Sequence, residues 1–214
     1  MQRKWIVMFI SIWAGLGVAQ AAEVAAINPN AGHVERWNWF ADATYALHQR
    51  LIKGRDVRIE ESVGGYHGEP EYYREEKFFD KKTGKLISTI QWEKKRPDNM
   101  HAIEVTVRDN TGKVLRDFSA LYLTHLRNAP QQTLINLYAH NKGLSAYRQF
   151  DASDNRIGEA CRGQYQGKKV DIELGEMEIL DLEDDPKSMM FGPLYKTCFK
   201  GLTVKSAGKY LTPQ

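Results

Sequence analysis

The chain has 214 residues, of which 42% are hydrophobic and 27% are charged, with a formal net charge of +3 at pH 7. This composition provides enough apolar residues for a folded core and argues against disorder over most of the length. The near-balance of charge argues against a nucleic-acid-binding protein, because such proteins usually carry a marked basic excess or a basic stripe.

The first 21 residues predict a secretory signal peptide. Arg3 and Lys4 give a cationic start, Trp5–Ala19 is almost wholly apolar, and residues 19–21 (Ala-Gln-Ala) match the small-x-small pattern of a cleavage site. We therefore expect cleavage before Ala22, and one exported globular domain over residues 22–214. Loss of Arg3 and Lys4 leaves 28 basic and 27 acidic residues, a net charge of +1.

A membrane anchor and a lipoprotein are the alternatives to a cleaved signal peptide. The apolar stretch Trp5–Ala19 has only 15 residues, whereas a membrane-spanning helix needs about 20. Lipid attachment needs a cysteine at the cleavage site, and the first cysteine is Cys161. No later segment is long and apolar enough to span a bilayer, so we expect no stable membrane insertion after cleavage.

Helical spacing characterises Val34–Lys53. Its apolar stripe consists of Trp37, Phe40, Ala41, Thr44, Leu47 and Leu51. Lys53 in the last turn and Gly54 just beyond it are typical of a helix end. The stripe is more typical of core packing than of a cofactor platform.

From Asp56 onward the pattern changes to alternation and β-rich composition. In His101–Arg108, for example, Ile103 and Val107 share one face while Glu104 lies on the other, which is typical of a sheet with one solvated side. The expected strands are 57–63, 72–79, 85–93, 101–108, 114–123, 134–139, 145–150, 157–161 and 169–174. Residues 130–141 fit a helix nearly as well as a strand. The predicted class is α+β: an N-terminal amphipathic helix packed on a curved antiparallel β-meander, with one disulfide.

Three short segments share a turn pattern of an acidic opener, a residue able to adopt positive φ, a basic residue and a new apolar strand. They begin at Asp80, Asp109 and Asp151. Short hairpin loops require such residues. The pattern predicts turns and carries almost no functional information.

The end of the chain changes character again. Residues 173–185 are strongly acidic, and they lack the ligand ladder and central glycine of a helix-loop-helix calcium site. We interpret this run as a solvated acidic surface. Ser206–Gln214 is expected to be a frayed tail.

Cys161 and Cys198 are the two cysteines of the chain. An oxidising compartment favours their pairing, and neither a Cys-x-x-Cys redox motif nor a haem attachment motif is present. We therefore predict a structural disulfide that closes a loop of 37 residues.

No known catalytic or metal-binding motif occurs in the sequence. It has no His-Glu-x-x-His, no Gly-x-Ser-x-Gly and no phosphate-binding glycine loop, and its six histidines are scattered. The sequence therefore predicts no catalytic residue, no metal and no cofactor.

The most suggestive segment for function is Gly64–Tyr73. Its three glycines and one proline predict a mobile or sharply turned loop. Four side chains offer contact groups for a ligand, namely Tyr66, His67, Tyr72 and Tyr73. The alternative is an irregular hairpin whose tyrosines border the core.

These observations favour an exported, periplasmic or extracellular, non-enzymatic binding or accessory protein. Its partner would be a small ligand or an envelope protein, and nucleic acid is not expected. The order of one helix followed by a meander is similar, at the level of fold, to exported cone-like and half-barrel ligand carriers, and fold does not determine function. The competing reading is a hydrolase-type enzyme with an acid/base pair from distant strands, for which His67 with Glu69 or Glu71 is the first candidate.

Overall fold

The computed structural model describes residues 32–124 and 128–214. The predicted signal peptide, residues 1–21, and the expected start at Ala22 lie outside these residues. A long helix, α1 (Gly32–Ile52), precedes nine strands. The strands are β1 (Val57–Tyr66), β2 (Glu69–Asp80), β3 (Leu86–Glu93), β4 (Arg96–Arg108), β5 (Val114–Leu121), β6 (Gln132–Asn141), β7 (Leu144–Phe150), β8 (Arg156–Tyr165) and β9 (Lys168–Gly175).

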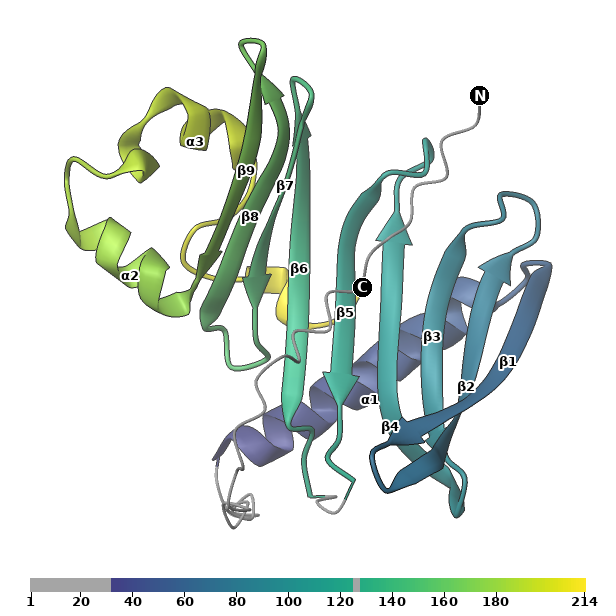
Figure 1. Ribbon diagram of the computed structural model, residues 1–214. Coiled ribbons are helices and arrows are strands. Elements are labelled where there is room, and N and C mark those ends of the chain that lie inside the picture. The colour runs from purple at the N-terminus through teal and green to yellow at the C-terminus, as the bar shows by residue number, and fades with distance from the viewer. Residues whose placement is uncertain (1–31, 125–127) are drawn as a thin grey trace.

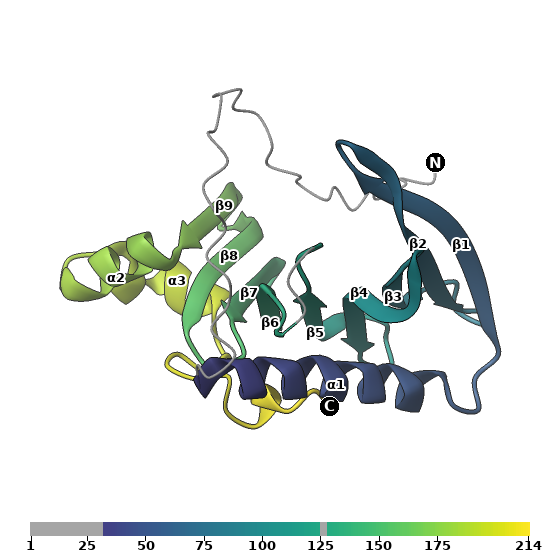
Figure 2. The same cartoon turned by 90° about the horizontal axis from the view of Figure 1, so that it is seen from below.

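The strands form one antiparallel sheet in the order β1 to β9, so each strand pairs with its sequence neighbours. This meander, the helix and one disulfide confirm the predicted α+β class. Figure 1 shows the strands side by side with α1 behind them. In Figure 2 the sheet is a trough whose two sides, β1–β2 and β8–β9, rise away from α1. Helix α1 thus lies against the convex face, and no helix among the described residues covers the concave face.

Helix α1 packs on the sheet through its apolar stripe. Phe40 and Ala41 are fully buried, and the Phe40 ring lies 6.3 Å from that of Phe118 on β5. The same cluster includes Ile103 on β4 and Ile135 on β6. Alternation along each strand places these side chains on one face, because successive residues of a strand point to opposite sides. The other half of each strand therefore faces the trough.

Two short helices follow the sheet: α2 (Glu176–Asp184) and α3 (Pro193–Cys198). Ile179 of α2 and Tyr195 of α3 pack with Leu144 and Cys161 of the sheet. Leu144 lies on the same face of β7 as Phe150, which belongs to the core cluster under α1. The sequence analysis did not predict these helices. None of the helices in the described part of the chain is long and apolar enough to cross a bilayer.

The three predicted turns each connect two strands. In each turn the aspartate side chain accepts a hydrogen bond from a backbone N–H two or three residues later, at 2.8 or 2.9 Å. Positive φ occurs at Gly84 (69°), Gly112 (84°) and Asp154 (71°). In the third turn it is Asp154, and not the neighbouring asparagine, that adopts this conformation.

Residues Gly64–Tyr73 form the irregular hairpin that the sequence left as the alternative to a mobile loop. Strand β1 continues to Tyr66 and β2 begins at Glu69, so only a two-residue turn separates them. The glycines serve close approach within the hairpin. A Cβ on Gly65 would lie 2.1 Å from the Glu69 carbonyl oxygen, at the position where the β1–β2 register shifts. Gly68 supplies the positive φ of the turn, at 90°.

Two other expectations are settled by packing. Residues 132–141 form strand β6, so the helical alternative for residues 130–141 is wrong. The expected frayed tail is also wrong, because Ala207 is 1% exposed and its N–H donates to Asp154 at 2.7 Å. Arg50 of α1 donates to the Pro213 carbonyl oxygen at 3.1 Å, which holds the end of the chain against the helix.

Candidate functional site

The predicted binding residues lie on the β1–β2 hairpin, and three of them surround His101 of β4. The ring centroids of Tyr66, Tyr72 and Tyr73 lie 5.6, 5.1 and 5.8 Å from the His101 ring. Tyr66 is 44% exposed, whereas Tyr72 is buried. The fourth residue, His67, is in the two-residue turn and is exposed. The structure therefore brings the three tyrosines together and leaves His67 outside their cluster.

His101 and Tyr72 anchor this aromatic cluster. His101 is 1% exposed, and burial lowers its pKa to about 4, so the ring is neutral near pH 7. Its Nε2 accepts or donates a hydrogen bond with the Tyr66 hydroxyl. The Tyr72 hydroxyl donates to Glu93 at 2.6 Å. The Tyr66–His101 contact attaches the hairpin to β4, and the Tyr72–Glu93 bond attaches it to β3. The Tyr73 ring stacks on the anchored His101 ring at an angle of 18°.

Tyr73 also lines a hollow on the concave face. The hollow has a volume of about 470 Å³ and lies over strands β2–β5. Its polar lining comes from the strand positions that point away from α1. The residues include Tyr73, Glu75, Lys77, Thr89, Gln91, Glu104 and Ser119, with Leu121 at one side. This volume lies within the range of small-molecule sites, and the lining is more polar than is usual for them.

At the β2 side of the hollow, the charged groups bind one another. Lys77 lies 2.9 Å from Glu75. The Gln91 amide donates to the second carboxylate oxygen of Glu75 at 2.8 Å. Glu75 and Lys77 are therefore already paired, and neither requires a ligand for its charge to be satisfied.

Glu104 at the floor of the hollow is different. It pairs with Thr89 of β3 and Ser119 of β5 in the sheet register. No hydrogen bond or ion pair joins its carboxyl to another residue in ranges 32–124 and 128–214. Burial, and then the negative charge of Asp117, raise the pKa of Glu104 to about 7. A carboxyl with a raised pKa in a hollow is a candidate functional group, since structural carboxyls are usually paired.

Asp117 on β5 belongs to a hydrogen-bond chain that crosses three strands. It accepts hydrogen bonds from the Asn136 amide and the Tyr138 hydroxyl of β6, each at 2.7 Å. The side-chain amide of Gln149 on β7 donates to Oδ1 of Asn136 at 2.9 Å, and this bond fixes the orientation of the Asn136 side-chain amide. Burial raises the pKa of Asp117 in spite of these donors. Burial, together with Asp117, also raises the pKa of Tyr138.

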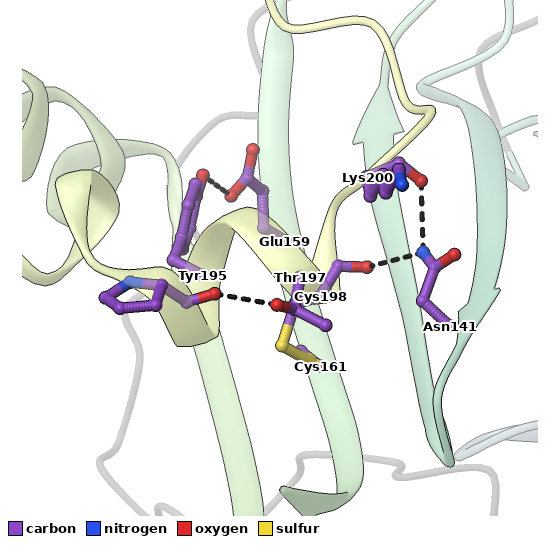
Figure 3. The surroundings of a disulfide bond; sticks show 8 residues. Asn141, Glu159, Cys161, Tyr195, Thr197, Cys198 and Lys200 are labelled. Atoms are coloured by element: carbon purple, nitrogen blue, oxygen red, sulfur yellow. Dashed lines mark hydrogen bonds between the residues drawn. A yellow bond between two sulfur atoms is a disulfide. The ribbon is translucent and has the colours of Figure 1, made fainter.

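A second hollow, of about 340 Å³, lies on the convex side near α3. Tyr195 lines it, and Figure 3 shows the surroundings of the nearby disulfide, with Glu159 beside Tyr195 and with Cys161 bonded to Cys198. The Cα atoms of the two cysteines are 5.9 Å apart, and the predicted disulfide is confirmed. The buried polar groups here bind one another, so this region fits a structural role.

The first acid/base candidate of the sequence analysis does not assemble. Glu69 pairs with Lys95 at 2.7 Å and Glu71 pairs with Lys94 at 2.6 Å, so both carboxylates are neutralised by lysines and not by His67. Across the described residues, no three His, Cys, Asp or Glu side chains are grouped so that they could hold a metal ion.

Sequence reasoning missed the group that now stands out, Glu104. Alternation placed it on the solvated face, but nothing in the sequence indicated that Asp117 would lie beside it or that the face would be hollowed. Comparisons of the chain with protein-family models, with curated proteins and with solved structures found no match.

Proposed function

We propose that this chain is an exported binding protein that holds a small polar ligand in the hollow of the concave face. The single observation that carries the proposal is the unpaired carboxyl of Glu104 at the floor of that hollow. The Glu104 side chain is half-buried, and its partial burial together with Asp117 disfavours the ionised form. A ligand that hydrogen-bonds to this carboxyl would offset part of that cost. Tyr73 adds ring area at the rim.

Export is supported by the N-terminal sequence pattern and by the disulfide, because disulfides persist in oxidising compartments. The proposed location is periplasmic or extracellular. Terminal sequencing of the exported protein tests this part: we expect Ala22 or the next residue as the first residue, and a chain that still begins at Met1 would contradict it.

Native mass spectrometry of the exported protein tests the binding function. We expect the wild type to retain a small molecule, or to bind one from a metabolite mixture, and the Glu104→Gln variant to lose it. Glu61→Gln is the matched control, since Glu61 is a 61% exposed carboxylate on β1 outside the hollow. Equal retention by Glu104→Gln, or no binding by the wild type, would contradict the proposal.

The predicted contribution of the hairpin is tested separately. If the hairpin contacts a ligand directly, changing Tyr66 and His67 together to alanine should weaken binding, although neither residue lines the hollow. Because Tyr66 also bonds to His101, the single change His67→Ala is the comparison that leaves this contact and the thermal midpoint unchanged.

A second candidate function is a hydrolase-type activity. It is favoured by two carboxyls, Glu104 and Asp117, which lie on adjacent strands of one face and both have raised pKa values. An acid/base pair of this kind can donate and accept protons near neutral pH. Assays with chromogenic ester and glycoside substrates test it, and turnover that is lost in both Glu104→Gln and Asp117→Asn would support it over simple binding.

A further inference from the structure

The charges around Glu104 do not balance. The charged and titratable groups that line the hollow with it, or that interact with it or with Asp117, come from β2, from its own strand β4, and from β5 and β6, while β3 contributes Thr89 and Gln91. They are Glu75, Lys77, Arg108, Asp117 and Tyr138. When all carboxyls are ionised, this floor has three negative groups, including Glu104, and two positive ones.

The two cations do not serve Glu104. Lys77 is bound to Glu75 at 2.9 Å. The charge of Arg108 acts on Asp117 and Tyr138, and its Nε is buried without a hydrogen-bond partner among the described residues. The positive charge of Arg108 therefore acts on Asp117. Glu104 is the carboxyl of this group that has no counter-ion among the described residues.

Several neutral donors of this face are also in use, and the hydroxyls of Thr89 and Ser119 are the ones that lie beside Glu104 in the register. The Asn136 amide and the Tyr138 hydroxyl both point at Asp117, at 2.7 Å each, and Gln149 holds Asn136 in that orientation. Gln91 donates to Glu75. The hydroxyls of Thr89 and Ser119 can supply hydrogen bonds but no charge, so a ligand that neutralises Glu104 must bring a positive charge.

The rim of the hollow suits the same kind of ligand. Tyr73 lines it, and the position of this ring is restricted from two sides: it stacks on His101, and a Cβ on Gly64 would lie 2.6 Å from its hydroxyl oxygen. In the sheet register Tyr73 lies four residues along β2 from Lys77, which is level with Glu104, so its ring would contact the organic part of a ligand whose amine reaches Glu104. An anionic ligand would instead meet an excess of carboxyl groups.

We propose that the hollow binds a small organic cation, and that an amine N–H of this ligand donates to the Glu104 carboxylate. The inference rests on the proposed binding function and deepens it by naming the ligand class.

A dependence on pH follows from this arrangement. The pKa of Glu104 is raised to about 7 in the free protein, and a bound ammonium group lowers it because it stabilises the ionised form. Below pH 7, binding must therefore release a proton. The affinity for an amine should rise with pH and level off above pH 7, with a roughly tenfold difference between pH 6 and pH 8.

Isothermal titration calorimetry of the full exported protein tests the inference, with benzylamine and cadaverine as probes and benzyl alcohol and pentanediol as neutral counterparts. We expect an amine to bind more tightly than its alcohol, with the pH dependence just stated. Titrations at pH 6 in two buffers of different ionisation enthalpy should detect proton release. Glu104→Gln should weaken amine binding at pH 8 by more than tenfold, and Glu61→Gln should not change it.

The outcomes separate this inference from the binding function itself. If the alcohols bind as tightly as the amines, or if amine binding has no pH dependence and releases no proton, the ligand class is wrong and the binding function remains. If neither amine binds to the wild type while native mass spectrometry finds another bound molecule, the inference is likewise overturned. If no probe binds and no ligand is retained, both proposals fail. The wild-type titrations decide the question even if Glu104→Gln does not fold.

Discussion

Loss of the buried carboxylate Glu159 should be among the most destabilising single changes in this protein. Glu159 of β8 and Arg148 of β7 are paired at 2.6 Å, with side-chain exposures of 0% and 4%. Arg156 lies 3.2 Å from the same carboxylate oxygen, and the Tyr195 hydroxyl donates to the other. The pair joins the end of the sheet to α3, so its removal affects both.

The size of the effect follows from which partners survive. In Glu159→Gln the side-chain volume is kept, but Arg148 loses its counter-ion while it stays buried. Arg148 keeps two neutral acceptors, the carbonyl oxygens of Leu202 at 3.1 Å and Thr203 at 2.8 Å. Removing one partner of a buried ion pair costs about 3–5 kcal/mol. The retained acceptors place the expected loss at the lower end, about 3 kcal/mol.

Urea unfolding followed by circular dichroism measures this loss as a change in the free energy of unfolding. The matched control is Glu173→Gln, which removes an exposed carboxylate paired with Arg162, and it should cost less than about 1 kcal/mol. Replacing Arg148 by methionine and Glu159 by leucine together should recover much of the stability, because Arg148 is no longer left as an unpaired buried charge and Arg156 keeps its pairing with Glu183. A loss below about 1 kcal/mol for Glu159→Gln would refute this reasoning.

Three further predictions follow from the same structure. Replacing Cys161 and Cys198 by alanine should lower the free energy of unfolding by about 4 kcal/mol, since the disulfide closes a loop of 37 residues; an unchanged urea midpoint would contradict this. Gly65→Ala should destabilise the protein by roughly 1–3 kcal/mol, because the new Cβ meets the Glu69 carbonyl oxygen, whereas Gly68→Ala, in open space, tests only the strain of positive φ. Glu104 binds a proton more tightly in the folded state than in the unfolded state, so stability from this group is lost as pH rises through about 7. At pH 8, Glu104→Gln should therefore be more stable than the wild type by about 3 kcal/mol. If the difference in free energy of unfolding between the wild type and this variant is the same at pH 5 and pH 8, the raised pKa is contradicted.

Local patterns in the sequence predicted the elements of the sheet. Each of the nine expected strands corresponds to an observed one, and alternation identified which residues of a strand share a face. In His101–Arg108, for example, Ile103 is in the core and Glu104 is on the concave face. Local rules succeed here because side-chain direction in a strand depends only on its period of two.

The errors lie where a residue type has more than one use. The glycines in residues 64–68 indicated a loop. In the structure, Gly64 and Gly65 are needed because a tyrosine ring approaches the first and a neighbouring backbone approaches the second too closely for a side chain. The tail after Ser206 looked free because it is polar and terminal, yet Asp154 and Arg50 bind it. These contacts join segments that are far apart in the sequence.

The sequence by itself determined the helix, the strands, the turns and the pairing of the two cysteines, because each depends on neighbouring residues or on the absence of any other cysteine. Only the tertiary structure decided that Tyr73, Glu104 and Asp117 share one concave face, and that Glu104 has no partner there. The curvature of the sheet sets which residues face one hollow, and burial sets the pKa of Glu104. Both are properties of the whole packed sheet, so no local pattern encodes them.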